Sequence, residues 1–501
     1  MYKIGILFEN REFEHDVYEL IKAFYPEAEI HTLYENAEAE YDLRFSVEQD
    51  NDSYIIKYER TENLSKQETE QKGVISADIL SKENAGCGIQ DAHALRKENK
   101  DNIKYALYQL LVKLTGRTLP WGNLTGIRPA KLAMGMIESG MKNTEAAREM
   151  RERYLVSPQK TALAITIANR EREILKDIDY ENGYSLYIGI PFCPSICLYC
   201  SFSSYPLKLW ASRTDEYLDA LCKEAEAVAS LMKSLGRKLD TIYIGGGTPT
   251  ALNEKALLRL MHMIHELFPV EETEEFTVES GRPDSITREK FCILKEAGVT
   301  RISINPQTMH QETLDLIGRA HTVVQTKEAF LLARECGFDN INMDMITGLP
   351  GEDISHVRAT LDEIFALRPE SLTVHSLAIK RAAHLNMEME KYQNMVKGST
   401  NEMLRLVDEY ASNMGMKAYY MYRQKNIPGN LENIGYCVSG KECLYNILIM
   451  EEKQDIISCG AGASSKYVFA DNRIERTENV KNLDHYINRI DEMIDRKRKY
   501  L

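Results

Sequence analysis

Three cysteines with a fixed spacing carry the most recognisable chemistry in the chain. Cys193, Cys197 and Cys200 form a C-x3-C-x2-C triplet that directly follows an apolar, strand-like stretch. Cysteine thiolates hold iron–sulfur clusters, and a [4Fe–4S] cluster with a protein ligand on every iron uses four of them. The triplet therefore predicts a [4Fe–4S] cluster in which one iron is left for a ligand from outside the protein.

A zinc site is the alternative interpretation of the triplet. Structural zinc sites use four Cys or His ligands in paired short spacings. No histidine lies between His93 and His262, and the next cysteine after the triplet is Cys222, so a fourth ligand is missing nearby. The sequence therefore favours the cluster. The remaining cysteines, which we expect to be structural, are Cys87, Cys222, Cys292, Cys336, Cys437, Cys443 and Cys459.

The spacing of the triplet resembles the signature of the radical SAM superfamily. In that superfamily the iron without a protein ligand is chelated by the amine and carboxylate of S-adenosylmethionine (SAM). The resemblance implies two cofactors, a [4Fe–4S] cluster and SAM.

Length and composition indicate a globular protein of several domains. The chain has 501 residues, of which 44% are hydrophobic and 28% charged, with a formal net charge of −14. Single cores rarely grow past about 250–300 residues. The acidic balance opposes non-specific binding to nucleic acid. We find no apolar run long enough to cross a bilayer and no signal-peptide pattern, so we expect a cytoplasmic protein with neither nucleic-acid nor membrane partners.

Short apolar strands alternate with helices from Tyr184 onward. The helices have recognisable ends, such as a capping box of Thr322 and Gln325,. This alternation predicts an α/β fold with a parallel sheet, and six repeats indicate a partial (β/α)6 barrel. The six predicted strands are Leu186–Ile190, Thr241–Ile244, Phe276–Glu279, Arg301–Ile304, Asn340–Ile346 and Leu372–His375.

The rest of the chain predicts extensions on both sides of the barrel. The pattern is α+β at first, then helical, and α+β again after the barrel,. We expect the polar stretch 60–70 to be a loop and a terminal helix over 483–498. The predicted domains are a small α+β domain (1–95), a helical domain (96–180), the barrel core (181–383) and a C-terminal α+β extension (384–501).

Polar residues fall at the predicted ends of the strands, where parallel barrels place their chemistry. The first strand leads into the cysteines, and the second into the run Gly245-Gly-Gly-Thr-Pro-Thr250. Glycines without Cβ let a ligand approach the backbone closely, so we expect this run to bind the methionine amine of SAM. Glu279 ends the third predicted strand, Gln307 follows the fourth, and Asp344 lies near the end of the fifth. These three residues and Arg319 could hold the rest of SAM.

These motifs together resemble the oxygen-independent coproporphyrinogen III dehydrogenases, most closely their HemZ-type branch. The similarity runs from about Tyr184 to Ser465 and includes Ser303-Ile-Asn-Pro-Gln307, Asp344-Met-Ile-Thr-Gly-Leu-Pro350 and Gly460-Ala-Gly-Ala-Ser464. The resemblance implies that Tyr187 and Tyr199 lie beside the cluster and SAM. It also implies SAM contacts for Gly246, Gly247, Thr248, Glu279, Gln307, Arg319 and Asp344.

The activity implied by the resemblance is the oxidative decarboxylation of two propionates of coproporphyrinogen III to vinyl groups, which gives protoporphyrinogen IX. The electron would come from a low-potential donor such as a flavodoxin or ferredoxin. A tetrapyrrole with four carboxylates needs fixed cations. The candidates for that role are Lys380, Arg381, Arg423 and Lys425, and Tyr419, Tyr420 and Tyr422 are candidates to line the macrocycle.

Two positions depart from the characterised dehydrogenases and keep other functions open. Phe202 stands where they carry a fourth cysteine, and Gly189 stands where they carry a histidine. The related haem-chaperone branch also carries Phe at the first of these positions. A haem-binding or haem-delivery protein without decarboxylase activity and a radical SAM methylase are therefore alternatives.

Overall fold

The chain forms two compact units in the structure, a computed structural model. Unit 1 comprises Met1–Thr166 and Arg423–Leu431, and unit 2 comprises Ile167–Tyr422 and Glu432–Leu501. The predicted division into four domains stays a prediction. The structure describes residues 2–34, 40–50, 53–64, 67–78, 92–126, 128–202, 204–379, 383–392, 394–396, 398–424, 430–470 and 473–500.

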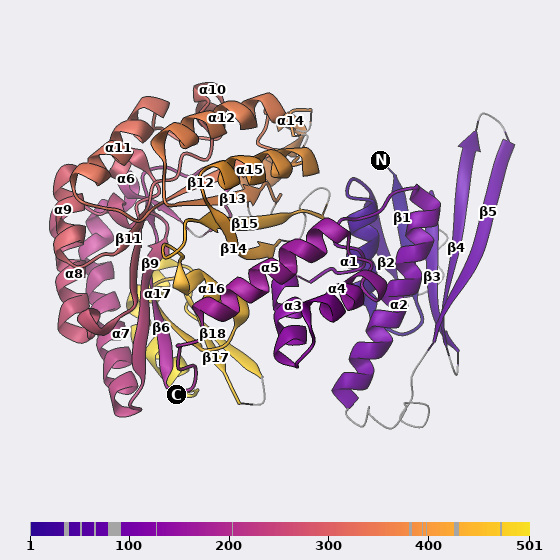
Figure 1. Ribbon diagram of the computed structural model, residues 1–501, viewed down its shortest axis with the longest axis horizontal. Coiled ribbons are helices and arrows are strands. Elements are labelled where there is room, and N and C mark those ends of the chain that lie inside the picture. The colour runs from indigo at the N-terminus through magenta and orange to yellow at the C-terminus, as the bar shows by residue number, and fades with distance from the viewer. Residues whose placement is uncertain are drawn as a thin grey trace. The chain divides into compact units, whose positions relative to one another are not determined.

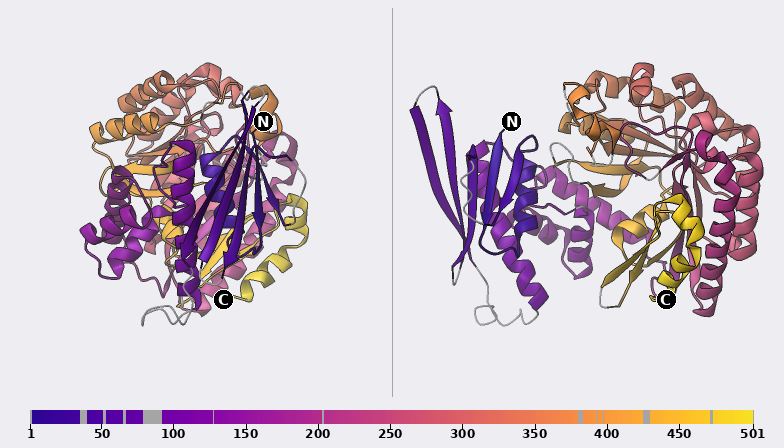
Figure 2. Two further views of the ribbon diagram at one scale, coloured as in Figure 1. Left: turned by 90° about the vertical axis from the view of Figure 1, so that its right-hand side faces the viewer. Right: turned by 180° about the vertical axis from the view of Figure 1, so that it is seen from behind.

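A mixed sheet forms the first part of unit 1 and is seen from two sides in indigo and violet in Figure 2. Its order among the described strands is β2-β1-β3-β4-β5. Strand β1 pairs in parallel with its neighbours β2 and β3, and β3, β4 and β5 follow as an antiparallel meander. The bounds are β1 Lys3–Phe8, β2 Glu29–Leu33, β3 Leu43–Asp50, β4 Ser53–Leu64 and β5 Gln67–Asp78.

The loop predicted over residues 60–70 is wrong for the part that the structure describes. β4 and β5 form one long hairpin whose pairing runs from Ser53↔Asp78 to Leu64↔Gln67. The hydrogen bonds of a ladder join backbone groups, so a polar sequence does not prevent pairing. Polarity indicates solvent exposure, which is compatible with a strand.

Helices pack on one face of this sheet and continue unit 1. Strand β3 alternates buried and less buried residues, so that Leu43, Phe45 and Val47 face the core together with Leu107 of α2 and Leu20 of α1,. The bounds are α1 Glu14–Phe24, α2 Ala92–Thr115, α3 Pro129–Glu138, α4 Asn143–Glu152 and α5 Pro158–Ile174, which continues into unit 2.

The centre of unit 2 is a run of parallel strands in the order β6-β9-β10-β11-β12-β13, each paired with the next. Each contains most or all of one predicted strand, and together they form the predicted partial (β/α)6 barrel. The bounds are β6 Gly183–Ile190, β9 Lys238–Gly246, β10 Glu275–Glu279, β11 Arg301–Ser303, β12 Ile341–Thr347 and β13 Ser371–Ser376.

Helices α7, α8, α9 and α11 lie in a row along the outer side of this sheet (Figure 1). Several begin at the side-chain caps that the sequence indicates, and the predicted capping box of Thr322 and Gln325 is present,. The helices that connect or follow the strands are α7 Thr214–Ser234, α8 Glu254–Leu267, α9 Arg288–Glu296, α11 Val323–Glu335, α12 Ile354–Leu367 and α15 Asn401–Asn413.

The C-terminal strands extend both edges of the same sheet. Beyond β13 come the antiparallel β15 and then β14; beyond β6 come β16, parallel to β6, and the antiparallel β17 and β18. Their bounds are β14 Lys417–Arg423, β15 Glu432–Cys437, β16 Asp455–Cys459, β17 Ser464–Val468 and β18 Ile474–Glu478.

The predicted terminal helix is two helices, α17 (Leu483–Asn488) and α18 (Ile490–Arg498), with Arg489 between them in a non-helical conformation. α18 is fixed by a buried ion pair in which the Lys497 ammonium lies 2.5 Å from Glu224 of α7. In the part of the chain that the structure describes, no helix combines the length and the apolar character needed to cross a bilayer.

Candidate iron–sulfur and nucleotide site

The three cysteines of the triplet lie on one short loop after β6. Cys193 ends the short strand β7 (Phe192–Cys193), which pairs in parallel with β8 (Tyr205–Pro206). Cys197 is buried and the other two are half-buried. Burial raises the pKa of the Cys193 thiol to about 11, and the nearby Cys197 and Cys200 act in the same direction. The structure therefore brings the three thiols together.

Their arrangement differs from a site for a single metal ion. Among the described residues, no three His, Cys, Asp or Glu side chains converge closely enough to hold one ion. The thiolates of a cubane cluster bind different irons, so they need not converge on one point. The geometry is compatible with the predicted cluster and gives no support to the zinc alternative.

The glycine run after β9 is joined to the cysteine loop by its backbone. Gly247 N donates to Ile190 O and Thr248 N to Phe192 O, both at 2.7 Å. The Thr248 hydroxyl lies 3.6 Å from the Cys193 sulfur. A Cβ on Gly247 would lie 2.5 Å from Phe192 O and 3.0 Å from that sulfur. Only glycine fits at this position, which explains the residue type through close approach.

Glu279 at the end of β10 faces the glycine run across the sheet. Its carboxylate accepts a hydrogen bond of 2.6 Å from the Tyr243 hydroxyl. The ring of Tyr243 stacks on Tyr187 at 6.2 Å and on Tyr445 at 4.4 Å. Burial raises the pKa of Glu279 to about 7, the Tyr243 hydrogen bond opposes this, and Asp344 adds to it,. Glu279 can therefore change its charge near neutral pH.

Gln307 lies in the loop after β11, and Asp344 lies within β12. Gln307 has φ 66°, a left-handed conformation that is strained for a residue with a side chain,. It is held there by backbone bonds to β12, with Gln307 N donating to Asp344 O at 2.9 Å. The Asp344 carboxylate lies 3.6 Å from His375 Nε2. Burial raises the pKa of Asp344, but His375 and Asn342 lower it more, so the net shift is downward.

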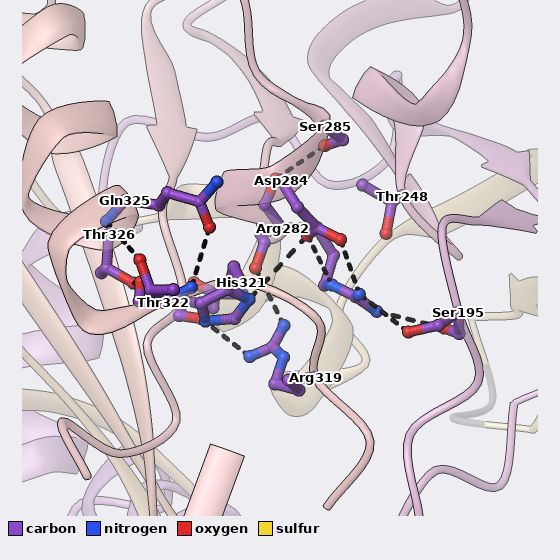
Figure 3. Close-up of polar contacts among 12 residues, drawn as sticks. Ser195, Thr248, Arg282, Asp284, Ser285, Arg319, His321, Thr322, Gln325 and Thr326 are labelled. Atoms are coloured by element: carbon purple, nitrogen blue, oxygen red, sulfur yellow. Dashed lines mark hydrogen bonds and ion pairs between the residues drawn. The ribbon is translucent and has the colours of Figure 1, made fainter. Parts of the chain in front are cut away.

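Tyr199 lies in the cysteine loop between Cys197 and Cys200, and Arg319 is close to it. Arg319 is buried and donates to Asn305 O at 2.7 Å and to Gly281 O at 3.0 Å (Figure 3). Burial raises the pKa of Tyr199, which Arg319 opposes and Cys197 reinforces, so these groups are close neighbours. The structure thus brings the predicted SAM residues together toward the carboxyl ends of the parallel strands. Their contact with SAM stays a prediction.

The residues present fit a cluster and a nucleotide ligand. The thiols form a set of soft donors, and the glycine run leaves a cradle that a Cβ would fill,. Two buried polar atoms of the predicted SAM residues, Gln307 Oε1 and Arg319 Nε, have no hydrogen-bond partner among the described residues. Buried polar atoms are nearly always hydrogen-bonded in proteins, so these two atoms point to a missing polar ligand.

The predicted substrate cations are mostly not placed. Lys380, Arg381 and Lys425 lie outside the described residues. Arg423 is 4% exposed, and its guanidinium donates to the backbone oxygen of Leu124 at 2.7 Å. Of the aromatic candidates, Tyr419 and Tyr420 are buried in a core cluster, whereas the Tyr422 hydroxyl lies 3.2 Å from His375 Nδ1. Any contact of these residues with a substrate stays a prediction.

Sequence reasoning missed several residues of this site. Arg282 and Asp284 follow Glu279 closely, and Tyr243 lies within β9. The rule that strand ends carry the chemistry could have found Arg282, because the run Gly281-Arg-Pro-Asp284 directly follows a predicted strand end. Tyr243 gave no such signal, because its hydroxyl reaches Glu279 only through the pairing of β9 with β10.

Comparison with known proteins supports the same class. The radical SAM superfamily pattern matches residues 187–364. The solved structure of coproporphyrinogen III oxidase (HemN) from Escherichia coli, described as a radical SAM enzyme, aligns with a TM-score of 0.50 at 23% identity, over 62% of this chain and 70% of that chain. Fold and site together define a radical SAM protein, a class that uses a [4Fe–4S] cluster and SAM.

Two curated relatives narrow the class to a family. The oxygen-independent coproporphyrinogen-III oxidase-like protein HemZ of Bacillus subtilis (strain 168) is 40% identical over 453 residues, 88% of this chain and 89% of the relative. The heme chaperone HemW of the same organism is 35% identical over 309 residues, 62% of this chain and 76% of the relative. The chain belongs to the family of oxygen-independent coproporphyrinogen-III oxidase-like radical SAM proteins.

Proposed function

We propose that the protein is a radical SAM enzyme that oxidatively decarboxylates two propionates of coproporphyrinogen III, giving protoporphyrinogen IX. The observation that carries this proposal is the backbone pairing of the glycine run with the start of the cysteine loop. Gly247 N donates to Ile190 O and Thr248 N to Phe192 O, both at 2.7 Å. This pairing puts the glycine run, which we propose binds SAM, beside the Cys193 sulfur. The relative named for coproporphyrinogen oxidation supports the choice of substrate.

The proposal assigns some residues to the cluster and others to SAM, according to their positions. When bound, the cluster and SAM supply an organic radical that removes one hydrogen atom from the substrate. Cys193, Cys197 and Cys200 hold the cluster. The other predicted residues fix SAM so that the radical forms facing the substrate, and these are Tyr187, Tyr199, Gly246, Gly247, Thr248, Glu279, Gln307, Arg319 and Asp344.

The substrate side must bind carboxylates and release carbon dioxide. Each round removes one hydrogen atom from the propionate β-carbon, loses carbon dioxide and passes one further electron to an acceptor, which leaves a vinyl group. Lys380, Arg381, Arg423 and Lys425 are the proposed cations for the remaining carboxylates. A low-potential donor such as a flavodoxin or ferredoxin is the proposed source of the electron that starts the reaction.

Haem binding or delivery without decarboxylation is the second candidate function. One observation favours it: Phe202, next to the cysteine triplet, is 69% exposed. The haem-chaperone branch that the sequence resembles also carries Phe at this position. The 35% identity to a relative named a heme chaperone points the same way.

Anaerobic turnover separates these functions. The reconstituted protein is incubated with SAM, a low-potential reductant and coproporphyrinogen III, and the porphyrins are separated by mass after oxidation. We expect the divinyl product together with 5′-deoxyadenosine, and neither from the Cys197→Ala variant. Haem binding with no vinyl product would replace the proposal by haem delivery, and a methylated product formed at the expense of a second SAM would replace it by methylation.

A further inference from the structure

A buried arginine outside the predicted site holds the cysteine loop. Arg282 follows β10 and is 3% exposed. A guanidinium has five N–H donors, and each has an acceptor here. Nε and Nη2 donate to the two carboxylate oxygens of Asp284 at 3.0 and 2.9 Å, and Nη2 also donates to Ser195 Oγ at 2.9 Å. Nη1 donates to Ser195 O at 3.1 Å and to Cys197 Sγ at 3.7 Å.

This network links the cysteine loop at Ser195 to the segment after β10 that carries Arg282 and Asp284 (Figure 3). It also reaches the turn after helix α10 (Gln311–Leu316). Ser195 Oγ donates in turn to Gly318 O at 2.9 Å, next to the predicted SAM residue Arg319. His321, on the far side of Asp284, is fully buried. Its Nδ1 lies 3.8 Å from an Asp284 carboxylate oxygen. Burial and the nearby cation Arg319 together lower the pKa of His321 to about 3, so the histidine is neutral at physiological pH. The Arg282–Asp284 pair is therefore the charged centre of the network.

The geometry gives Arg282 an electrostatic effect on any cluster bound at Cys197. Reduction of a [4Fe–4S] cluster by one electron adds one negative charge next to this sulfur. A cation stabilises that charge more strongly in a buried, low-dielectric site than in water. Hydrogen bonds to cluster sulfurs and the local charge are among the factors that set the reduction potential. Asp284 opposes the effect from a greater distance, because the guanidinium lies between it and the sulfur.

We propose that Arg282 is a positioning residue that orients the Cys197 thiolate and raises the reduction potential of the cluster, with Asp284 as its counter-charge. The inference rests on the cluster that the proposed function places on the three cysteines, and it makes no use of the substrate. It assigns a role to the run Gly281-Arg-Pro-Asp284. The reaction that it affects is the uptake of one electron from a low-potential one-electron donor.

The test is the midpoint potential of the cluster in the reconstituted full-length protein without SAM. The sample is titrated anaerobically with dithionite through redox mediators, and the reduced cluster is measured by EPR. We compare the wild type with Arg282→Gln, Arg282→Lys and Asp284→Asn. Arg288→Gln is the matched control, because it removes the same charge from a side chain that is 54% exposed and paired with Glu335.

The two sides of the ion pair should shift the potential in opposite directions. We expect Arg282→Gln to make reduction at least about tenfold less favourable, a shift of 59 mV to more negative potential for one electron. Asp284→Asn should shift it to more positive potential, Arg282→Lys should lie between Arg282→Gln and the wild type, and Arg288→Gln should match the wild type.

Shifts in the same direction from Arg282→Gln and Asp284→Asn, or unchanged potentials, would overturn the proposal. If Arg282→Gln fails to assemble a cluster, the comparison of Arg282→Lys and Asp284→Asn with the wild type decides, because opposite directions are still required. A wild-type protein without any [4Fe–4S] signal would instead contradict the proposed function, so the two failures are distinguishable.

Discussion

The carboxyl of Glu279 should make SAM binding depend on pH in a defined direction. Burial raises its pKa to about 7, so the group is partly protonated under ordinary conditions. Only the ionised carboxylate offers acceptors on both oxygens, and one oxygen already accepts from Tyr243. We expect Glu279 to accept hydrogen bonds from SAM, so the affinity of the protein for SAM should rise as the pH rises through 7.

The size of the effect follows from the fraction of ionised carboxylate. With a pKa of about 7, Glu279 is roughly one-eleventh ionised at pH 6 and roughly ten-elevenths ionised at pH 8,. The apparent dissociation constant scales inversely with the competent fraction. The contribution of Glu279 should therefore lower the Kd for SAM about tenfold between these pH values, which is about 1.4 kcal/mol.

Equilibrium dialysis with labelled SAM under anaerobic conditions measures this effect in the wild type and in Glu279→Gln. The α-amino group of SAM titrates as well, at about 7.7–8.0 for an ordinary α-amine, but it does so equally with both proteins. The ratio of the two dissociation constants isolates Glu279 and should change about tenfold from pH 6 to pH 8. Parallel pH profiles for the two proteins would refute the reasoning.

Three further predictions concern stability. Gly247→Ala should lower the free energy of unfolding by about 1–3 kcal/mol and reduce iron incorporation, because the new Cβ meets two backbone oxygens within 3 Å,. Gly135→Ala in α3 is the control and should be neutral or stabilising, because nothing lies within 4 Å of its Cβ,. Urea unfolding and iron analysis check both variants. Lys497→Met should destabilise the protein by about 3–5 kcal/mol in urea unfolding, because it leaves the buried Glu224 without its cation, and a loss under 1 kcal/mol would contradict this,. A carboxyl whose pKa is raised on folding adds stability that is fully present below its unfolded pKa of about 4.3 and is lost as the pH rises through 7,. In urea unfolding the cluster-free Glu279→Gln variant should therefore exceed the wild type at pH 8 by up to about 2 kcal/mol and match it at pH 4, and an equal gap at both values would contradict this,.

The sequence predicted those parts of the site that depend on short-range spacing. The cysteine triplet is contiguous, and a polar residue at a strand end is recognisable because the strand before it is apolar. Parallel strands then bring such ends to one edge without further information. The rule predicts Glu279, Gln307 and Asp344: in the structure Glu279 ends β10, Gln307 lies in the loop after β11, and Asp344 lies within β12.

Contacts set by the pairing of distant strands were not predictable. Tyr243 reaches Glu279 because Ile244 pairs with Val278, and His375 reaches Asp344 because β12 and β13 lie in register. The C-terminal strands were expected as an extension, yet they pair with both edges of the barrel sheet. An edge strand carries no local signal of which distant edge it joins, since any exposed ladder offers the same backbone groups.

The EPR spectrum of the reduced, anaerobically reconstituted protein, recorded with and without SAM, tests the central claim most directly. If three cysteines hold a cluster and leave one iron for SAM, the reduced protein should show a [4Fe–4S] signal that changes shape when SAM is added. A protein that forms no such cluster, or a cluster whose signal SAM leaves unchanged, would contradict the account.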